Sequence, residues 1–157
     1  MEIGVALAQM AVAPGEVTVN ERAARDVAAQ AAGEGMDLLV LPEMWPAGYD
    51  LARAREYAAP LRSGPFGVMA GLAREHGLHV MGTALEENGE GQPFNTAALY
   101  APDGSLLAAY RKVHLWAPLG EAEHMTAGGE MPAFDLPWGR TALAICYDLR
   151  LPEKWRA

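Results

Sequence analysis

The chain has 157 residues, enough for one domain with a sizeable core and too few for two ordinary ones. Its net charge of −8, from 12 Lys and Arg against 20 Asp and Glu, argues against nucleic acid and anionic membrane surfaces as partners. The single cysteine, Cys146, excludes an internal disulfide and a cysteine-based zinc site, and it fits a reducing compartment. We therefore expect a cytoplasmic protein.

The first part of the chain has the pattern of a βαβ unit. A short apolar run at residues 3–9 predicts a strand. Residues 20–35 predict an amphipathic helix with Asn20 as its N-cap and a glycine at its end. The continuous apolar run at residues 37–42 is typical of a strand in a sheet that helices cover.

The middle of the chain repeats this order and then changes to antiparallel strands. Residues 63–77 predict a helix that ends at Gly77, and residues 78–84 predict a strand. Residues 94–115 contain two strand patterns joined by a Pro-Asp-Gly turn, which predicts a β-hairpin.

The last part of the chain is expected to be a loop followed by a strand and a helix. Gly and Pro interrupt residues 117–137, which therefore predict a loop. Residues 141–146 predict a final buried strand, and a helix is expected to begin at residues 151–153.

Three chemically capable residues each follow or end a strand-like run: Glu43, Lys112 and Cys146. In α/β proteins, side chains at strand ends emerge from the packed sheet into a crevice. A carboxylate can take a thiol proton, an ammonium can stabilise an oxyanion, and a thiolate can attack a carbonyl. Taken singly, each residue also has an ordinary structural interpretation: a solvated loop Glu, a solvated edge Lys, and a small buried Cys.

The surroundings of Cys146 favour the nucleophile. A strand, a sharp turn and a helix near it would expose the thiol and direct backbone N–H groups at an oxyanion. Asp148 and Arg150 are expected to fix this turn through hydrogen bonds to backbone or to each other. A Cys–His pair with His114 is a weaker alternative, and a hydrogen-bonding structural role is the main expectation for that histidine. The other histidines lack the spacing of a metal site.

Three segments resemble the carbon–nitrogen hydrolase family, the nitrilase superfamily, and in particular its amidase-like members: "LPEMWPAGYD", "YRKVHLW" and "ICYDLRLPE". The resemblance runs across nearly the whole chain. It implies that Glu43 is the general base, that Lys112 stabilises the oxyanion, and that Cys146 is the nucleophile. It also implies that the backbone N–H of Tyr147 shares the oxyanion hole.

The family carries a second glutamate between the lysine and the cysteine, before an aromatic residue. Glu121 fits this position, with Met125 in place of the aromatic, and Glu123 is a rival. Tyr49 and Trp116 are expected to bind the substrate, although aromatic packing is the default for such residues. The resemblance implies no metal and no organic cofactor, and we expect a homodimer or a larger homo-oligomer.

Family members are longer than this chain, so residues 1–157 are expected to be the N-terminal part of a four-layer αββα sandwich and a single incomplete carbon–nitrogen hydrolase domain. The leading functional hypothesis is hydrolysis of a small-molecule amide to a carboxylic acid and ammonia through a Cys thioester. One alternative is a catalytically silent remnant that acts as an interaction module. Another is an N-carbamoyl amidohydrolase or a nitrilase that uses the same triad.

Overall fold

The computed structural model describes residues 2–89 and 91–152, and five of its strands form one mixed sheet. In sheet order they are β1 (Val5–Leu7), β2 (Leu38–Val40), β3 (His79–Glu86), β4 (Phe94–Tyr100) and β5 (Leu106–Arg111). The first three strands run parallel, whereas β4 and β5 pair antiparallel with their neighbours. The predicted α/β class and the predicted hairpin are therefore confirmed.

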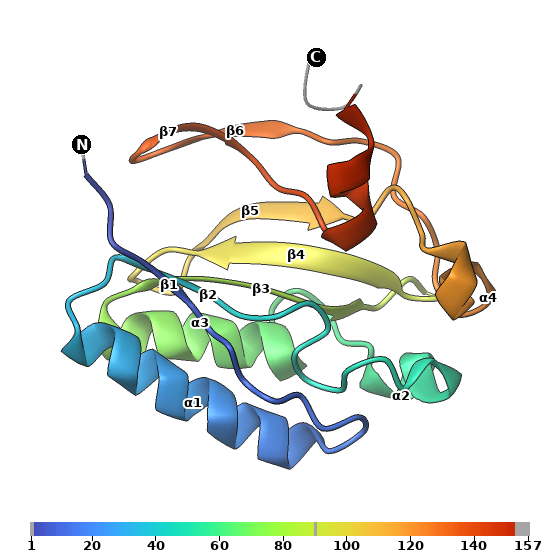
Figure 1. The fold of residues 1–157 in the computed structure, drawn as a ribbon, viewed down its shortest axis with the longest axis horizontal. Coiled ribbons are helices and arrows are strands. Elements are labelled where there is room, and N and C mark those ends of the chain that lie inside the picture. The colour runs from blue at the N-terminus through green and yellow to red at the C-terminus, as the bar shows by residue number, and fades with distance from the viewer. Residues whose placement is uncertain (1, 90, 153–157) are drawn as a thin grey trace.

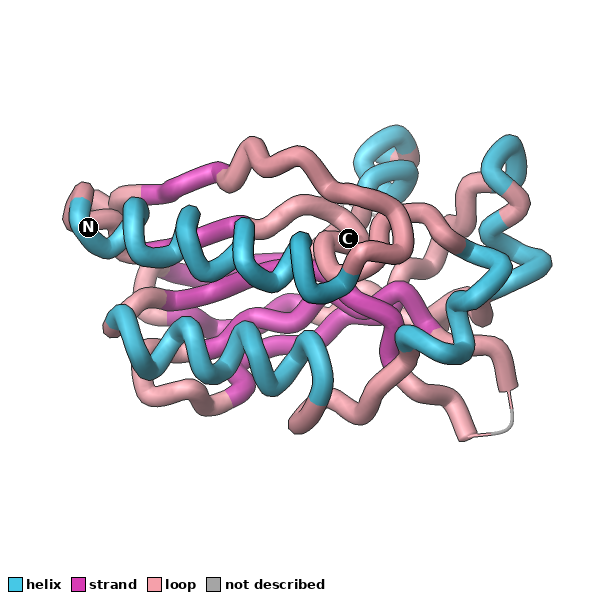
Figure 2. The backbone as a smooth tube through the Cα atoms, turned by 90° about the horizontal axis from the view of Figure 1, so that it is seen from below, coloured by secondary structure: helices cyan, strands magenta, loops and turns pink. Residues whose placement is uncertain are grey.

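Two helices, α1 (Val17–Gly33) and α3 (Gly64–His76), cover one face of this sheet (Figures 1 and 2). The predicted helix 63–77 is confirmed as α3, and it ends because Gly77 adopts a left-handed φ of 66°. The helices and the sheet enclose a core of fully buried side chains. Its larger members are Leu39, Trp45, Phe66, Met69, Leu72 and Val80.

Asn20 is not the N-cap of the first helix, as the sequence predicted. The helix begins at Val17 with Glu16 as its cap residue, so Asn20 lies inside α1 and is completely buried. Its side-chain amide donates to the carbonyls of Ala13 and Pro46, at 2.8 and 2.9 Å, and its oxygen accepts from the Ala13 N–H. Asn20 thus joins the loop after β1 to the loop after β2.

A second β-hairpin, β6 (Ala133–Leu136) and β7 (Gly139–Ala142), lies over the other face of the sheet (Figure 1). Strand β4 is buried on both faces because its side chains alternate: Ala98 contributes to the helix-side core and Leu99 to the hairpin-side core. The prediction of a loop through residues 117–137 was therefore wrong at β6, and also at residues 117–119 and 121–124, which form short helical segments. The apolar side chains of β6 pack on the sheet although the segment is rich in turn-forming residues.

Five short helical segments complete the described structure. They are η1 (Leu51–Arg53), α2 (Ala54–Tyr57), η2 (Ala117–Leu119), α4 (Glu121–His124) and η3 (Cys146–Arg150). The helix expected from residues 151–153 falls largely on residues 153–157, which lie outside the described residues. The described part of the chain thus provides a helix layer, a sheet and a hairpin, which are three layers in the order of the αββα sandwich.

Candidate active site

Glu43 lies in a tight turn that follows β2 and spans residues 43–49. The next residue, Met44, has a left-handed φ of 53°, which is uncommon for a residue with a side chain. Its backbone N–H donates to the Thr83 hydroxyl on β3 at 2.7 Å. This bond and the Asn20 contact with Pro46 hold the turn against the sheet and helix α1.

The Glu43 carboxylate accepts hydrogen bonds on both of its oxygens. Oε1 accepts from Lys112 Nζ and from Asn95 Nδ2, each at 2.9 Å. Oε2 accepts from the Tyr49 hydroxyl at 2.6 Å. Two of these three donors come from the β4–β5 hairpin and its end, and the third comes from the same turn as Glu43 itself.

Lys112 directly follows β5 and has no exposed side-chain surface. Its backbone N–H donates to the Asn95 carbonyl at 2.8 Å, which continues the pairing of β5 with β4. Its Nζ donates to Glu121 Oε1 at 2.8 Å as well as to Glu43, so one ammonium bridges two carboxylates. We call Glu43, Lys112 and Glu121 the carboxylate–ammonium cluster.

Glu121 is the first residue of α4 and is completely buried, whereas Glu123 is exposed. The second oxygen of Glu121 accepts from the Trp116 N–H at 2.6 Å. Met125, which stands where the family carries an aromatic residue, is buried with Met44. Of the two glutamates that the sequence left open, Glu121 is therefore the one that contacts Lys112.

The electrostatics of the cluster keep Lys112 charged. Burial alone would lower the pKa of Lys112, but its hydrogen bonds to Glu121 and Glu43 outweigh burial and raise that pKa above its ordinary value. An ammonium has three N–H donors, and the two carboxylates use two of them. In the described structure, an incoming oxygen could accept a hydrogen bond from the third N–H.

Cys146 begins the short helix η3, with an exposed side chain and a left-handed φ of 47°. The predicted strand 141–146 was wrong beyond Ala142, where β7 ends. Leu143 and Ile145 are nevertheless buried against the sheet, which explains why the sequence reads as a buried strand. We call the segment Cys146–Arg150 the Cys146 turn.

The Cys146 thiol lies near the carboxylate–ammonium cluster. Partial burial raises its pKa above the ordinary value, the Glu43 carboxylate raises it further through its charge and a hydrogen bond, and Lys112 opposes this effect. A nucleophile with a raised pKa needs a base during attack, and Glu43 is the carboxylate that contacts it.

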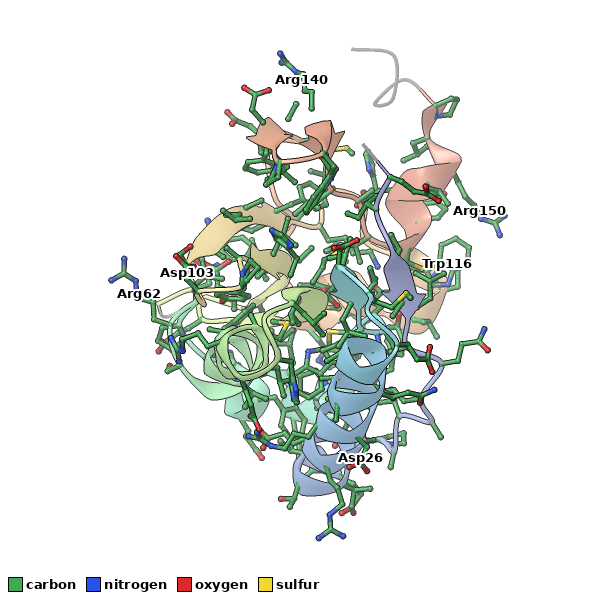
Figure 3. The ribbon with its side chains drawn as sticks, turned by 90° about the vertical axis from the view of Figure 1, so that its left-hand side faces the viewer. Asp26, Arg62, Asp103, Trp116, Arg140 and Arg150 are labelled. Carbon is green, nitrogen blue, oxygen red and sulfur yellow. The ribbon has the colours of Figure 1, made fainter. Side chains whose placement is uncertain are left out.

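Asp148 holds the Cys146 turn, as the sequence predicted, and it is completely buried. One of its oxygens accepts from the Tyr110 hydroxyl at 2.6 Å and from the Ile145 N–H at 3.0 Å. The other accepts from the His114 N–H at 3.0 Å and lies 2.8 Å from His114 Nδ1. His114 therefore pairs with Asp148, in keeping with the structural role expected for it. Arg150, the other expected support, is exposed and directed outward (Figure 3).

An apolar recess of about 370 Å³ adjoins the thiol. The ring centroids of Trp116 and Tyr147 are 4.6 Å apart, and Leu149 is 71% exposed at the recess. The recess is lined by Trp116, Leu119, Cys146, Tyr147, Leu149 and Arg150. Trp116 and Cys146 thus line the same recess, whereas the Tyr49 hydroxyl contacts Glu43; the substrate-binding roles of Trp116 and Tyr49 stay predictions.

Two of the Glu43 contacts were missed at the level of sequence. The donation from Asn95 had a visible signal, since an asparagine interrupts the apolar strand "FNTAALY". The donation from Tyr49 had none, because only the closure of the 43–49 turn brings its hydroxyl back to Glu43.

Among the residues that the structure describes, no group of three or more His, Cys, Asp or Glu side chains could hold a metal ion.

These features define an α/β protein with a thiol set beside a carboxylate–ammonium cluster at the ends of its strands. The chain belongs to the carbon–nitrogen hydrolase family, whose family model matches residues 4–157. The fold likewise matches structures of the nitrilase superfamily.

Two relatives and one solved structure illustrate this similarity. The omega-amidase NIT2 of Homo sapiens is 32% identical over 131 residues, which cover 79% of this chain and 48% of that protein. The 2-oxoglutaramate amidase of Bacillus subtilis is 33% identical over 117 residues, covering 74% and 45%. A mutant of the amidase from Nesterenkonia sp. AN1, with the acetamide moiety of fluoroacetamide added covalently at its active-site cysteine, is 27% identical. Its TM-score is 0.87, and the match covers 98% of this chain and 59% of that chain. The chain thus spans about half the length of the curated relatives that it matches.

Proposed function

We propose that this protein is a thiol-dependent amidase that converts a small-molecule amide to a carboxylic acid and ammonia. The observation that carries the proposal is the bridge that Lys112 forms between Glu43 and Glu121 beside the Cys146 thiol. A base, a fixed cation and a nucleophile are the groups that acyl transfer through a thioester requires.

In the proposed first half-reaction, Glu43 takes the Cys146 proton while Sγ attacks the amide carbon and forms a C–S bond. The carbonyl oxygen becomes an oxyanion, and the third donor of Lys112 and the Tyr147 N–H stabilise it. The C–N bond then breaks, and the proton held by Glu43 passes to the leaving nitrogen, which departs as ammonia. Loss of one such oxyanion donor would cost about 3 kcal/mol of transition-state stabilisation.

In the second half-reaction, Glu43 takes a proton from water, and the hydroxyl attacks the thioester carbon. The C–S bond breaks, the sulfur regains a proton, and the carboxylic acid leaves. Glu121 has a supporting role: it completes the charge balance around Lys112 and aims Nζ, since its two oxygens join Lys112 to the Trp116 backbone.

The relatives and the recess support the proposed substrate class. Two relatives are named as amidases of omega-amide or 2-oxoglutaramate substrates, and the Nesterenkonia protein is an amidase. The recess beside Cys146 is mainly apolar, which suits a short aliphatic acyl group held against Trp116. N-Carbamoyl compounds and nitriles are the competing substrates, because the same three residues serve all of them.

The direct test measures ammonia release from butyramide, 2-oxoglutaramate, an N-carbamoyl amino acid and a nitrile. We expect turnover of at least one of the two amides, and loss of turnover in Cys146→Ala. Activity that survives this substitution would overturn the thioester mechanism, whereas turnover of only the carbamoyl compound or the nitrile would overturn the amide assignment.

A second candidate, an interaction module without catalysis, is favoured by one feature. β1 lies at the end of the sheet order, and the side chain of Leu7 is 71% exposed on it. An edge strand of this kind can pair with another chain. Sedimentation of the wild-type protein and of Leu7→Lys tests this candidate. An interaction module that pairs through β1 requires the wild-type protein to associate and Leu7→Lys to associate less. Cys146-dependent turnover decides against a silent remnant.

We further propose a reducing, cytoplasmic location and a homo-oligomeric state. The exposed thiol of Cys146 supports the first, because an exposed free cysteine survives best where thiols stay reduced. No helix among the described residues is long and apolar enough to cross a membrane. Sedimentation velocity of the purified protein tests the oligomeric state, and a monomer at all concentrations would contradict it.

A further inference from the structure

The turn that carries Glu43 also carries a second residue whose polar atom reaches the reacting groups. Gly48 has a left-handed φ of 60°, and its N–H donates to the Met44 carbonyl at 2.7 Å. This closure brings the hydroxyl of Tyr49 to Oε2 of Glu43, six residues back along the chain, at 2.6 Å. Gly48 suits this closure because a Cβ there would lie 3.2 Å from Val12.

We propose that Tyr49 is a positioning residue for Glu43: its hydroxyl fixes Oε2 while Lys112 and Asn95 fix Oε1, so that the carboxylate meets the Cys146 thiol in a single orientation. This inference rests on the proposed function, in which Glu43 is the base. It replaces the substrate-binding role expected for Tyr49 with a role exerted through another side chain.

The geometry of the three donors supports this role. A carboxylate held through one oxygen alone can still rotate about its terminal torsion, which is soft for Glu. Bonds to both oxygens remove this freedom, and the short 2.6 Å distance is that of a charge-assisted O–H···O⁻ bond.

Tyr49 can act as a donor throughout the working pH range. Burial raises the pKa of Tyr49 well above its ordinary value, and its hydrogen bond to Glu43 and the charges of Glu43, Cys146 and Glu121 add to this. The charged and titratable groups around Glu43 are Lys112, Glu121, Tyr49 and Cys146, and Lys112 is the cation among them. The phenol therefore supplies a fixed dipole and exchanges no proton.

The chain offers a matched control for the loss of one phenolic hydroxyl. Tyr57 donates to Asp50 Oδ2 at 2.6 Å, the same distance and the same kind of acceptor, outside the catalytic machinery. We therefore compare Tyr49→Phe with Tyr57→Phe, measuring kcat and KM for butyramide at neutral pH.

For Tyr49→Phe we expect kcat to fall about 10-fold, a part of the contribution of a general base, with KM changed less than about two-fold. Tyr57→Phe should match the wild type. A raised KM with unchanged kcat would make Tyr49 a substrate-binding residue, and an equal loss in Tyr57→Phe would show a general effect of the missing hydroxyl.

A second readout separates failure of this inference from failure of the proposed function. Alkylation of Cys146 by iodoacetamide needs the thiolate but no amide turnover. Its pH profile should move to higher pH in Tyr49→Phe and stay unchanged in Tyr57→Phe, because an unshielded Glu43 carboxylate disfavours the thiolate more strongly. An unchanged profile in Tyr49→Phe would overturn the positioning role even if amides are hydrolysed. A shifted alkylation profile in Tyr49→Phe, together with a wild-type protein that hydrolyses no amide, would refute the proposed function alone.

Discussion

Lys112 and Cys146 are close enough to influence each other electrostatically, yet the protein holds them in opposite ways. Lys112 is fully buried, and both side-chain carboxylates that it contacts are bonded to further donors. Cys146 is exposed, and the turn that carries it is fastened through the single carboxylate of Asp148. The fixed charges are thus set in the packed interior, while the group that must meet the substrate remains at the surface.

This difference has an energetic meaning. A buried charge is tolerated only when it is paired and hydrogen-bonded. Removing one member of the carboxylate–ammonium cluster therefore destabilises the whole cluster. The Cys146 turn instead keeps a left-handed backbone at a residue with a side chain, a conformation that costs of order 1–3 kcal/mol and needs support from its surroundings.

Removing the ammonium should have the largest effect. Lys112→Met keeps the length of the side chain but leaves Glu43 and Glu121 without their cation, and we expect a loss of about 3–5 kcal/mol in the free energy of unfolding. Arg140→Met, at an exposed cation on β7, is the matched control and should stay within about 0.5 kcal/mol of the wild type. Urea unfolding measures both. Equal small losses would mean that the cluster does not act as a unit.

Weakening the support of the Cys146 turn should have a smaller effect on stability. In Asp148→Asn the side-chain NH₂ replaces one of the two acceptors, so the Ile145 N–H or the His114 N–H loses its partner. We expect a loss of about 1–3 kcal/mol, the cost of an unsatisfied buried donor, together with reduced turnover. Asp135→Asn, at an exposed carboxylate on β6, should leave both quantities unchanged. A fully active Asp148→Asn would show that the turn needs no such support.

Removing the charge of Glu43 should speed alkylation of Cys146 but abolish amide turnover. Because Glu43 raises the pKa of Cys146, Glu43→Gln should lower that pKa and speed alkylation by iodoacetamide several-fold at neutral pH. Amide turnover should nevertheless be lost, since glutamine cannot accept the thiol proton. Alkylation that slows in this variant would contradict the contact between the carboxylate and the thiol. Full turnover would exclude Glu43 as the base.

The smallest effect on stability is expected at the ion pair of Glu86 and Arg111, away from the thiol. Glu86 is bound by Arg111 and Thr96, and although burial opposes it, these partners hold the pKa of Glu86 below its ordinary value. Its stabilisation is therefore present above the unfolded-state pKa and is lost as the pH falls through the lower folded-state pKa. The Arg111 side chain is 49% exposed, so the effect should stay below about 1 kcal/mol. Glu86→Gln should reduce the acid-dependent loss of stability, and an unchanged pH dependence would contradict the pairing.

The sequence could predict the elements whose signals are local. Helix α3 has a proline in its first turn and a glycine at its end, and the β4–β5 hairpin has a Pro-Asp-Gly turn, so local chemistry fixes both. The apolar run at residues 141–146 misled because burial and strand pairing usually coincide, whereas here burial continues after the pairing with β6 ends. Asn20 misled because its amide serves a tertiary bond to the Pro46 carbonyl, 26 residues away.

The sequence could predict which residues are candidates for the site, but not which side chains are hydrogen-bonded to one another. Glu43, Lys112 and Cys146 stand out because each follows or ends an apolar run. Which glutamate contacts Lys112 depends on the direction of α4, and the bond from Tyr49 depends on the closure at Gly48. Such contacts join residues through tertiary geometry, which no spacing in the sequence encodes.

Capture of the acyl group would show directly whether a thioester forms at Cys146. Hydroxylamine added during turnover of butyramide intercepts a thioester and releases butyrohydroxamate, which mass spectrometry measures. We expect hydroxamate from the wild-type protein and none from a Cys146→Ala variant that retains the wild-type circular dichroism spectrum. Ammonia released without hydroxamate, or equal hydroxamate from both proteins, would contradict a thioester at Cys146.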